Sequence, residues 1–570
     1  MFIKKKNGFK KKSRDSQDKI ILIGIDGATW KVMQPLIEEG KLPNMARLIR
    51  EGSSGVLLSQ EPLISPVIWA SIATGKRPEK HGITDFANKK KNSYNFDFFT
   101  SSDRKVKAFW NILSDYGLSV GLINWWTTWP SEKINGYIVS DHFLLLNLIL
   151  KGLTKEELMD SDIPGLTYPE KILKTVQRYQ KIRNIPKAFS YQGHKEISIE
   201  EALQFIRRAK SEEINIAELE KSLLISKIKS FCLQDKRTFL IGRDLLKESP
   251  VDLFAIYLEG VDVVQHYFWE FYEPQAEGFN FHPTKEEIDL FGKIIPEYYE
   301  WQDTLIGELL DNFNMGKTTV IIVSDHGFGA FHDPFPYVVA LNFIFERLGW
   351  LEFKENKIFW PQSTVYEPIR FKGQYHAVCL NLQGREPEGV VKADEYEEMK
   401  RTINNMLTGL KTTDGEKVFE DVRMIENPIE EDLDFEVKIN TSLSPEDKLF
   451  IKGEAVPLKK FLVPNPRGGD HAPEGVIILS GSHIKKGQVI GGATIYDVTP
   501  TILSLLGIPV GKDMDGKPLL EAIEEDYLKR IPSVFIDSHD SVWEAEESNP
   551  HEIIFDEEMK EKLKSIGYMQ

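Results

Sequence analysis

Two pairs of Asp and His residues in this sequence have the spacing of metal ligands. Asp262 and His266 are four residues apart, which places both side chains on one face of a helical turn. Asp325 and His326 are adjacent and stand beside Gly327. Carboxylate and imidazole together favour zinc or a similar divalent ion. An ordinary polar pair is the alternative for Asp262 and His266, whereas consecutive Asp and His before glycine favour a ligand turn.

Three other polar clusters each add one candidate residue. Asp26 precedes Gly27, where a turn or a helix cap is the alternative. Ser65 precedes Pro66 and helix-compatible residues, so a helix N-cap is its alternative. His471 lies among glycines, where an exposed loop histidine is the alternative. Together, three Asp, three His and one Ser hydroxyl suit a site for two divalent ions, which can activate a hydroxyl and hold phosphoryl oxygens.

Five short apolar runs give these candidates their positions, because each run ends abruptly in polar residues. The runs, with a polar residue that follows each, are 20–25 with Asp26, 118–123 with Asn124, 253–258 with Asp262, 320–323 with Asp325, and 476–479 with Ser480. Runs of this length with little alternation predict strands buried on both faces. Helical patterns lie between them, at 105–116 and 297–314. The sequence therefore predicts an α/β fold with a mostly parallel sheet flanked by helices, and its ligands at the carboxyl ends of the strands.

Two long segments interrupt the alternation and are expected to be insertions. The first is rich in Lys, Glu, Ile and Leu at helical spacing and predicts a helical cap that controls substrate access without supplying ligands. The second has alternating stretches that predict a hairpin-bearing unit. The expected order is a basic disordered tail (1–19), catalytic core (20–149), helical insertion or cap (150–250), core (251–335), second insertion (336–465), core (466–520) and an acidic C-terminal extension (521–570).

The order of the motifs resembles that of the alkaline phosphatase superfamily. Within this superfamily the sequence most resembles the type I phosphodiesterase/nucleotide pyrophosphatase branch and, more specifically, predicted phosphohydrolase or phosphomutase proteins. The residues that support it are Asp26, Ser65 with Thr74-Gly75 and His81-Gly82, Gly121-Leu-Ile-Asn-Trp125, Asp262 with His266, Asp325-His326, His471 and the segment 495–516. The resemblance implies an alkaline-phosphatase-like sheet and covers about 20–145, 250–335 and 466–520.

The resemblance also implies roles for these residues. One divalent ion would be bound by Asp262, His266 and His471. The other would be bound by Asp26, Asp325, His326 and the Ser65 oxygen. Zinc is the expected metal, with manganese as the alternative. Ser65 would attack phosphorus to give a covalent phosphoryl-serine, and water would hydrolyse it. The substrate would be a small phosphoester, and Asn124 is the expected substrate contact, with Asn88 as an alternative.

Composition limits the other functions. The formal net charge is −16 at pH 7, which argues against wholesale binding of nucleic acid. The two cysteines allow no disulfide framework, and no apolar run is long enough to span a bilayer, so a cytoplasmic protein is expected. A phosphomutase or phosphotransferase on the same scaffold, or a binding protein without catalytic activity, remains the alternative function.

Overall fold

The central element of the fold is a nine-stranded sheet. A computed structural model describes residues 19–540 except 90–93, 95, 144–163, 277–282, 312, 332–336, 355–356, 369–374, 426–432 and 465–467. The expected N-terminal tail, apart from Lys19, and most of the acidic extension lie outside these residues. The strand order is β23-β2-β22-β9-β1-β8-β5-β6-β7. The bounds are β1 Lys19–Ile25, β2 Gly52–Leu58, β5 Val120–Ile123, β6 Gly136–Val139, β7 Thr167–Tyr168, β8 Leu253–Leu258, β9 Thr318–Val323, β22 Glu474–Gly481 and β23 Gln488–Thr494.

The sheet is mostly parallel, as the apolar runs predict. Strand β1 pairs in parallel with β8 and β9, and β5 pairs in parallel with β8 and β6. Strand β22 runs antiparallel to β9 and β2, and β7 runs antiparallel to β6. The direction of β22 corrects one expectation. Ser480, at its carboxyl end, lies at the sheet edge opposite Asp26 and Asp325, because the strand is reversed.

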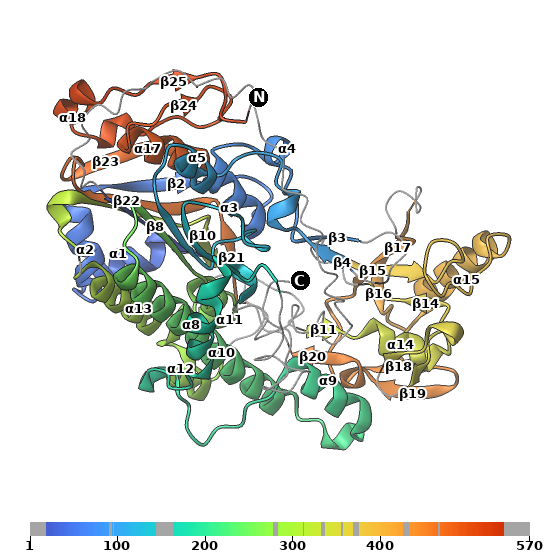
Figure 1. The fold of residues 1–570 in the computed structure, drawn as a ribbon. Helices are drawn as coiled ribbons and strands as arrows, with labels where there is room; N and C mark the ends of the chain where they lie inside the picture. Colours follow the sequence, from blue (N-terminus) through green and yellow to red (C-terminus); the bar gives the residue numbers. More distant parts are fainter. Residues whose placement is uncertain are drawn as a thin grey trace.

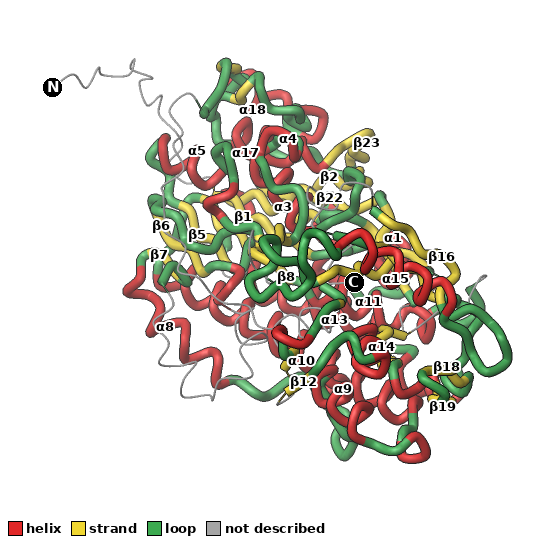
Figure 2. The backbone as a smooth tube through the Cα atoms, turned by 90° about the vertical axis from the view of Figure 1, so that its right-hand side faces the viewer, coloured by secondary structure: helices red, strands yellow, loops and turns green. Residues whose placement is uncertain are grey.

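Helices cover both faces of this sheet (Figure 1). One face carries α1 Trp30–Glu38, α2 Pro43–Arg50, α10 Ile216–Glu248, α11 Gly260–Tyr272 and α13 Ile294–Leu310, and the other carries α3 Ser65–Thr74, α5 Phe109–Asp115 and α17 Val498–Leu505. Figure 2 shows the strands enclosed between these two helical layers. Strands β8 and β9 are buried throughout and largely apolar, because neither of their faces meets water.

The second expected insertion forms a smaller unit with its own core, at the right of Figure 1. Its four-stranded sheet has the order β14-β15-β17-β16 (Val365–Tyr366, Tyr375–Leu380, Phe435–Ile439 and Phe419–Met424). A separate hairpin of β18 Lys448–Ile451 and β19 Glu454–Pro457 contributes to the same core. Helices α14 Leu341–Leu348 and α15 Tyr396–Gly409 pack on this core. The second insertion therefore contains the predicted hairpin, together with a four-stranded sheet and two helices.

The helical segment expected over 150–250 contacts two cores. Its shorter helix, α9 Ile199–Arg208, packs with Leu219 and Leu223 from the start of α10 in a small cluster. The rest of α10, from Leu224 to Leu246, belongs to the core of the central sheet. The long helix therefore covers strands β5 and β8 directly instead of standing clear of them.

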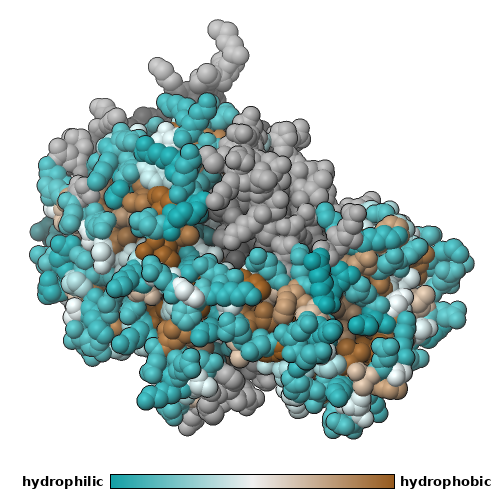
Figure 3. Space-filling model, turned by 90° about the horizontal axis from the view of Figure 1, so that it is seen from below, coloured by the Kyte–Doolittle hydropathy of each residue, from teal (hydrophilic) through white to brown (hydrophobic). Residues whose placement is uncertain are grey.

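The described residues on one face of the molecule are mostly polar. In Figure 3 this face is largely hydrophilic, with hydrophobic patches between the hydrophilic residues. No helix within the described ranges is long and apolar enough to cross a membrane.

Candidate functional site

The carboxyl ends of the parallel strands bring the predicted ligands together. Asp26 follows β1, Asp325 and His326 follow β9, and Asp262 lies in the first turn of α11, just after β8. Since β8, β1 and β9 are neighbours in the sheet, the three carboxylates converge at one edge. The structure thus confirms the positions that the apolar runs predict for these residues.

His471 reaches this edge by a different route. It lies in β21 Gly469–Ala472, which pairs antiparallel with β10 Gly327–Ala330 and places His471 opposite Phe328. These two short strands flank the second insertion and hold its two ends together. Strand β22 begins directly after β21, and because it is reversed, its amino end lies at the ligand edge.

The first group of ligand atoms comes from Asp262, His266 and His471. His471 Nε2 lies 3.2 Å from Asp262 Oδ1 and 2.9 Å from His266 Nε2. His266 Nδ1 donates to the Gly469 carbonyl oxygen at 2.9 Å, and His471 Nδ1 donates to the Leu63 carbonyl oxygen at 3.0 Å. Both Nε2 atoms therefore present lone pairs, and two acceptors this close repel each other unless a cation lies between them.

The second group comes from Asp26, Asp262 and His326, whose ligand atoms lie within 4.8 Å of one another. His326 Nε2 lies 3.3 Å from Asp26 Oδ1 and 3.4 Å from Asp325 Oδ2. Within the part of the chain that the structure describes, these three atoms are buried without a hydrogen-bond partner. His326 Nδ1 donates to the Gly327 carbonyl oxygen, which again turns Nε2 toward the carboxylates. Asp262 Oδ1 belongs to both groups, so one carboxylate links them.

The pKa values of Asp26, Asp325 and His326 in the second group are all shifted from their usual ranges. Burial and the charge of Asp26 raise the pKa of Asp325 well above its usual range. Burial alone would also raise the pKa of Asp26, but the neighbouring imidazole of His326 and the hydrogen bond from Tyr257 lower it. Burial disfavours the charged imidazole, yet the neighbouring carboxylates raise the pKa of His326 to about 10. Buried carboxylates this close repel one another when they are charged, and a bound cation would offset that repulsion.

Two aromatic residues orient Asp26 and were not predicted from the sequence. The Tyr257 hydroxyl, at the end of β8, donates to Asp26 Oδ2, and Trp69 Nε1 donates to the same oxygen at 3.4 Å. They leave Oδ1 facing His326. The available signal was a single tyrosine within an apolar strand, together with a tryptophan one helical turn after Ser65. Position 24 favours glycine, because a Cβ there would lie 2.6 Å from a carbon of the Trp69 ring.

Ser65 is the first residue of α3 and is buried. Ile64 is the N-cap residue of this helix, so the alternative in which Ser65 is the N-cap is wrong. The His471 ring bonds the carbonyl oxygen of Leu63, two residues before Ser65, and Trp69 lies on the Ser65 face of the helix, against Asp26. The start of α3 therefore lies beside both ligand groups.

Asn124 lies at the same sheet edge, directly after β5. Its φ of 59° is in the left-handed region, which asparagine tolerates better than most residues. The side-chain amide donates to the Tyr257 carbonyl oxygen at 3.5 Å. The position suits the predicted substrate contact, which stays a prediction. The side chain of Asn88, the alternative, lies outside the described residues.

His81 has a structural environment. It is fully buried, and its Nδ1 accepts from the backbone N–H of Ile83 at 3.1 Å. Nε2 therefore donates to the Ser71 hydroxyl, at 3.0 Å. Burial and the charge of Arg104 lower the pKa of His81 to about 3. The motif His81-Gly82 thus contributes a neutral core histidine and no ligand.

This burial predicts an acid sensitivity. The pKa of His81 is near 6.5 in the unfolded chain and about 3 in the folded chain. Between these two pH values the unfolded chain binds a proton at His81 and the folded chain does not. Stability is therefore lost as the pH falls below the unfolded value. Between pH 7 and 5 we expect wild type to lose about 2 kcal/mol of unfolding free energy more than His81→Asn does. Urea unfolding at both pH values measures it, and parallel losses in the two proteins would contradict it.

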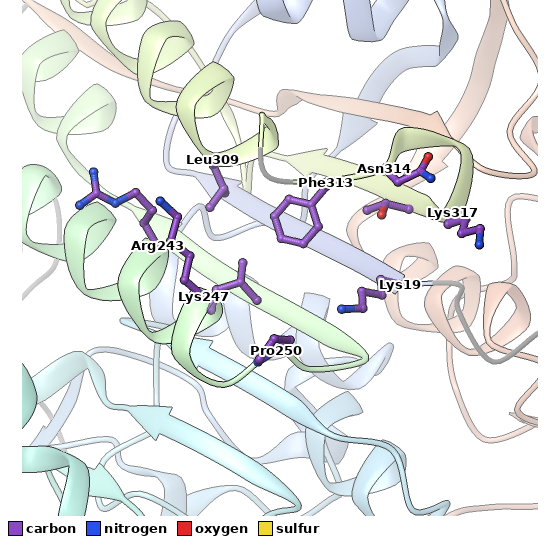
Figure 4. A pocket seen from close by; sticks show the side chains of 10 residues that line it. Lys19, Arg243, Lys247, Pro250, Leu309, Phe313, Asn314 and Lys317 are labelled. Atoms are coloured by element: carbon purple, nitrogen blue, oxygen red, sulfur yellow. The ribbon is translucent and has the colours of Figure 1, made fainter.

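A cavity at the opposite edge of the sheet is separate from this site (Figure 4). It has a volume of about 560 Å³ and lies near Lys19 and Thr318, where β1 and β9 begin. Its cations include Arg243 and Lys247, in the last turns of α10, where positive charge is favourable beside the final carbonyl groups. None of its lining residues is a predicted ligand.

Comparison with known proteins identifies the family of this chain. The type I phosphodiesterase / nucleotide pyrophosphatase family model matches residues 20–453. No curated protein matches the chain.

Several solved structures are similar to this chain at low identity. Phosphonoacetate hydrolase from Sinorhizobium meliloti 1021 is 14% identical, with a TM-score of 0.37, over 85% of this chain and 94% of that one. Human ectonucleotide pyrophosphatase / phosphodiesterase 5 is 11% identical, with a TM-score of 0.40, over 90% and 99%. A mutant of alkaline phosphatase PafA is 12% identical, with a TM-score of 0.42, over 90% and 100%. Because the family model spans most of the chain, this protein belongs to the type I phosphodiesterase / nucleotide pyrophosphatase family.

Proposed function

We propose that this enzyme is a two-metal phosphoester hydrolase in which Ser65 is the nucleophile. The observation that supports this most directly is the pair of ligand groups joined at Asp262 Oδ1. The lone pairs of His266 and His471 face each other at 2.9 Å, and buried ligand atoms of Asp26, Asp325 and His326 make no hydrogen bond. This donor set of carboxylates and imidazoles fits zinc, with manganese as the alternative.

Two sets of side chains would hold the two ions. Asp262, His266 and His471 would hold one ion, and Asp26, Asp325 and His326 would hold the other with the Ser65 oxygen, while Asp262 lies within reach of both. Bound divalent ions lower the pKa of a hydroxyl and neutralise phosphoryl oxygens. The carbonyl oxygens of Gly469, Leu63 and Gly327 fix the imidazole tautomers, which are the ones that a divalent ion requires.

The protein's own residues would carry out the rest of the reaction. Ser65 Oγ attacks phosphorus, the bond to the leaving alcohol breaks, and a phosphoryl-serine forms. Water then hydrolyses that ester and restores the serine. A serine hydroxyl is a weak nucleophile until it is activated. The rigid position of Ser65 at the start of the buried helix α3 limits the orientations that the hydroxyl must sample before attack.

We expect the protein to hydrolyse bis(p-nitrophenyl) phosphate or p-nitrophenyl phosphate, and to lose that activity when a chelator removes its metal. Zinc or manganese added back should restore turnover, because the fold itself positions the ligand groups. Release of p-nitrophenol measures both substrates. The ratio of the two rates gives the preference for diesters over monoesters.

The same assay separates the alternatives. A phosphotransferase or phosphomutase would form a new phosphoester when an alcohol is added, while a hydrolase would release phosphate at an unchanged ratio to p-nitrophenol. A protein without catalytic activity would bind metal and release no p-nitrophenol. Metal binding without turnover of any phosphoester in a broad library would contradict the proposal.

A further inference from the structure

Asp235 is a buried carboxylate from the helical segment whose sequence predicts only a role in substrate access. It lies in α10 and has no exposed surface. Its Oδ1 accepts from the backbone N–H of Glu259 at 3.0 Å, and its Oδ2 accepts from that of Gly260 at 3.1 Å. These two groups open helix α11, whose N-cap residue, Glu259, makes no side-chain cap of its own. Asp235 therefore caps a helix to which it does not belong.

A second helix completes this contact. From α13, the Tyr298 hydroxyl and Gln302 Nε2 donate to Asp235 Oδ2, at 2.9 and 2.7 Å. The carboxylate thus accepts four hydrogen bonds and joins α10, α11 and α13 behind the ligand edge. Such a buried charge is stabilised only where donors surround it.

Gly260 records how closely these groups approach. A Cβ at this position would lie 1.9 Å from the Tyr298 hydroxyl oxygen and 2.7 Å from Asp235 Oδ2. Only glycine allows the start of α11 to contact both. The backbone at Gly260 is therefore held against the carboxylate with little freedom to shift.

We infer that Asp235 is a positioning residue for the metal ligands of α11. Asp262 lies two residues after Gly260, and His266 lies one turn later. Asp262 Oδ1 belongs to both ligand groups, so a shift of the start of the helix changes the distances in each. The inference rests on the proposed metal-dependent function. It gives the helical segment a role in metal binding although that segment supplies no ligand.

The test is a Zn²⁺ titration of the chelator-treated full chain against a competing dye. Asp235→Asn keeps the volume but turns one acceptor into a donor that faces N–H or O–H donors. We expect its Zn²⁺ affinity to fall about 10- to 100-fold, as loss of residues that orient ligands does. Excess Zn²⁺ should then return kcat to near the wild-type value.

Asp244→Asn is the matched control from the same helix, because Asp244 accepts from Tyr179 and Arg243 and has no bond to α11. Its Zn²⁺ affinity should stay within twofold of wild type. A merely structural Asp235 would lower Tm equally with and without Zn²⁺ and leave the affinity unchanged, and that result would overturn the inference. If Asp235→Asn does not fold, Tyr298→Phe, which removes one donor, is judged by the same criterion.

The outcomes also separate this inference from the proposed function. A wild-type protein that binds neither Zn²⁺ nor Mn²⁺ contradicts the proposed function, and the inference fails with it. A wild type that binds and hydrolyses, beside an Asp235→Asn variant of equal affinity, overturns the inference alone.

Discussion

Ser65→Ala is expected to abolish almost all phosphoester hydrolysis while the protein stays folded. Removing the nucleophile of a hydrolase costs several orders of magnitude in rate, on the order of 10⁴-fold or more, with residual activity from binding and electrostatics. The stability cost should be small, because Ile64, and not Ser65, is the N-cap of α3. Steady-state turnover of the metal-loaded protein, together with its Tm, measures both effects.

Two variants sharpen this test. Ser65→Thr keeps a hydroxyl at the same position and should retain measurable turnover. Ser71→Ala removes a buried hydroxyl from the same helix, where it bonds His81 and Gln60, and should lower Tm but leave turnover near wild type. Wild-type rates in Ser65→Ala would exclude Ser65 as nucleophile, and with it the covalent route.

His326→Ala is expected to lower the metal content from two ions per chain to one. His326 Nε2 faces Asp26 and Asp325 at 3.3 and 3.4 Å, so its loss removes the only imidazole of the second described ligand group. His471→Ala should remove the other ion, because His471 faces Asp262 and His266. Hydrolysis should fall steeply in both variants, since each ion neutralises part of the phosphoryl charge. Elemental analysis after gel filtration measures the stoichiometry.

His376→Ala is the control for both changes. His376 lies in the second insertion, where its Nδ1 pairs with Glu367 at 2.8 Å, away from the ligand groups. Its metal content should equal that of wild type. An unchanged metal content in both His326→Ala and His471→Ala would contradict the ligand assignment.

Local sequence patterns determined which sheet edge carries most of the site. The runs before Asp26, Asp262 and Asp325 are apolar enough to be strands buried on both faces, and parallel neighbours must end at one edge. The resemblance to the type I phosphodiesterase branch is confirmed by the family model. The domain boundaries, the role of Asn124 and a cytoplasmic location stay predictions.

The packing of distant segments decided the rest. His471 reaches its ligand group because β21 pairs with β10 across the second insertion and β22 runs antiparallel to β9. The residues beside His471 in the sequence predict neither pairing. The sharing of Asp262, the neutral His81 and the support from Asp235 depend in the same way on contacts between helices and strands far apart in the chain. In the sequence, Asp235 is a charged residue one turn from Phe231 and from Phe239, on an apolar helix face. Only the tertiary structure shows which backbone N–H groups donate to its carboxylate. A residue's neighbours in sequence set its strand or helix, whereas hydrogen bonds across the core set its chemistry.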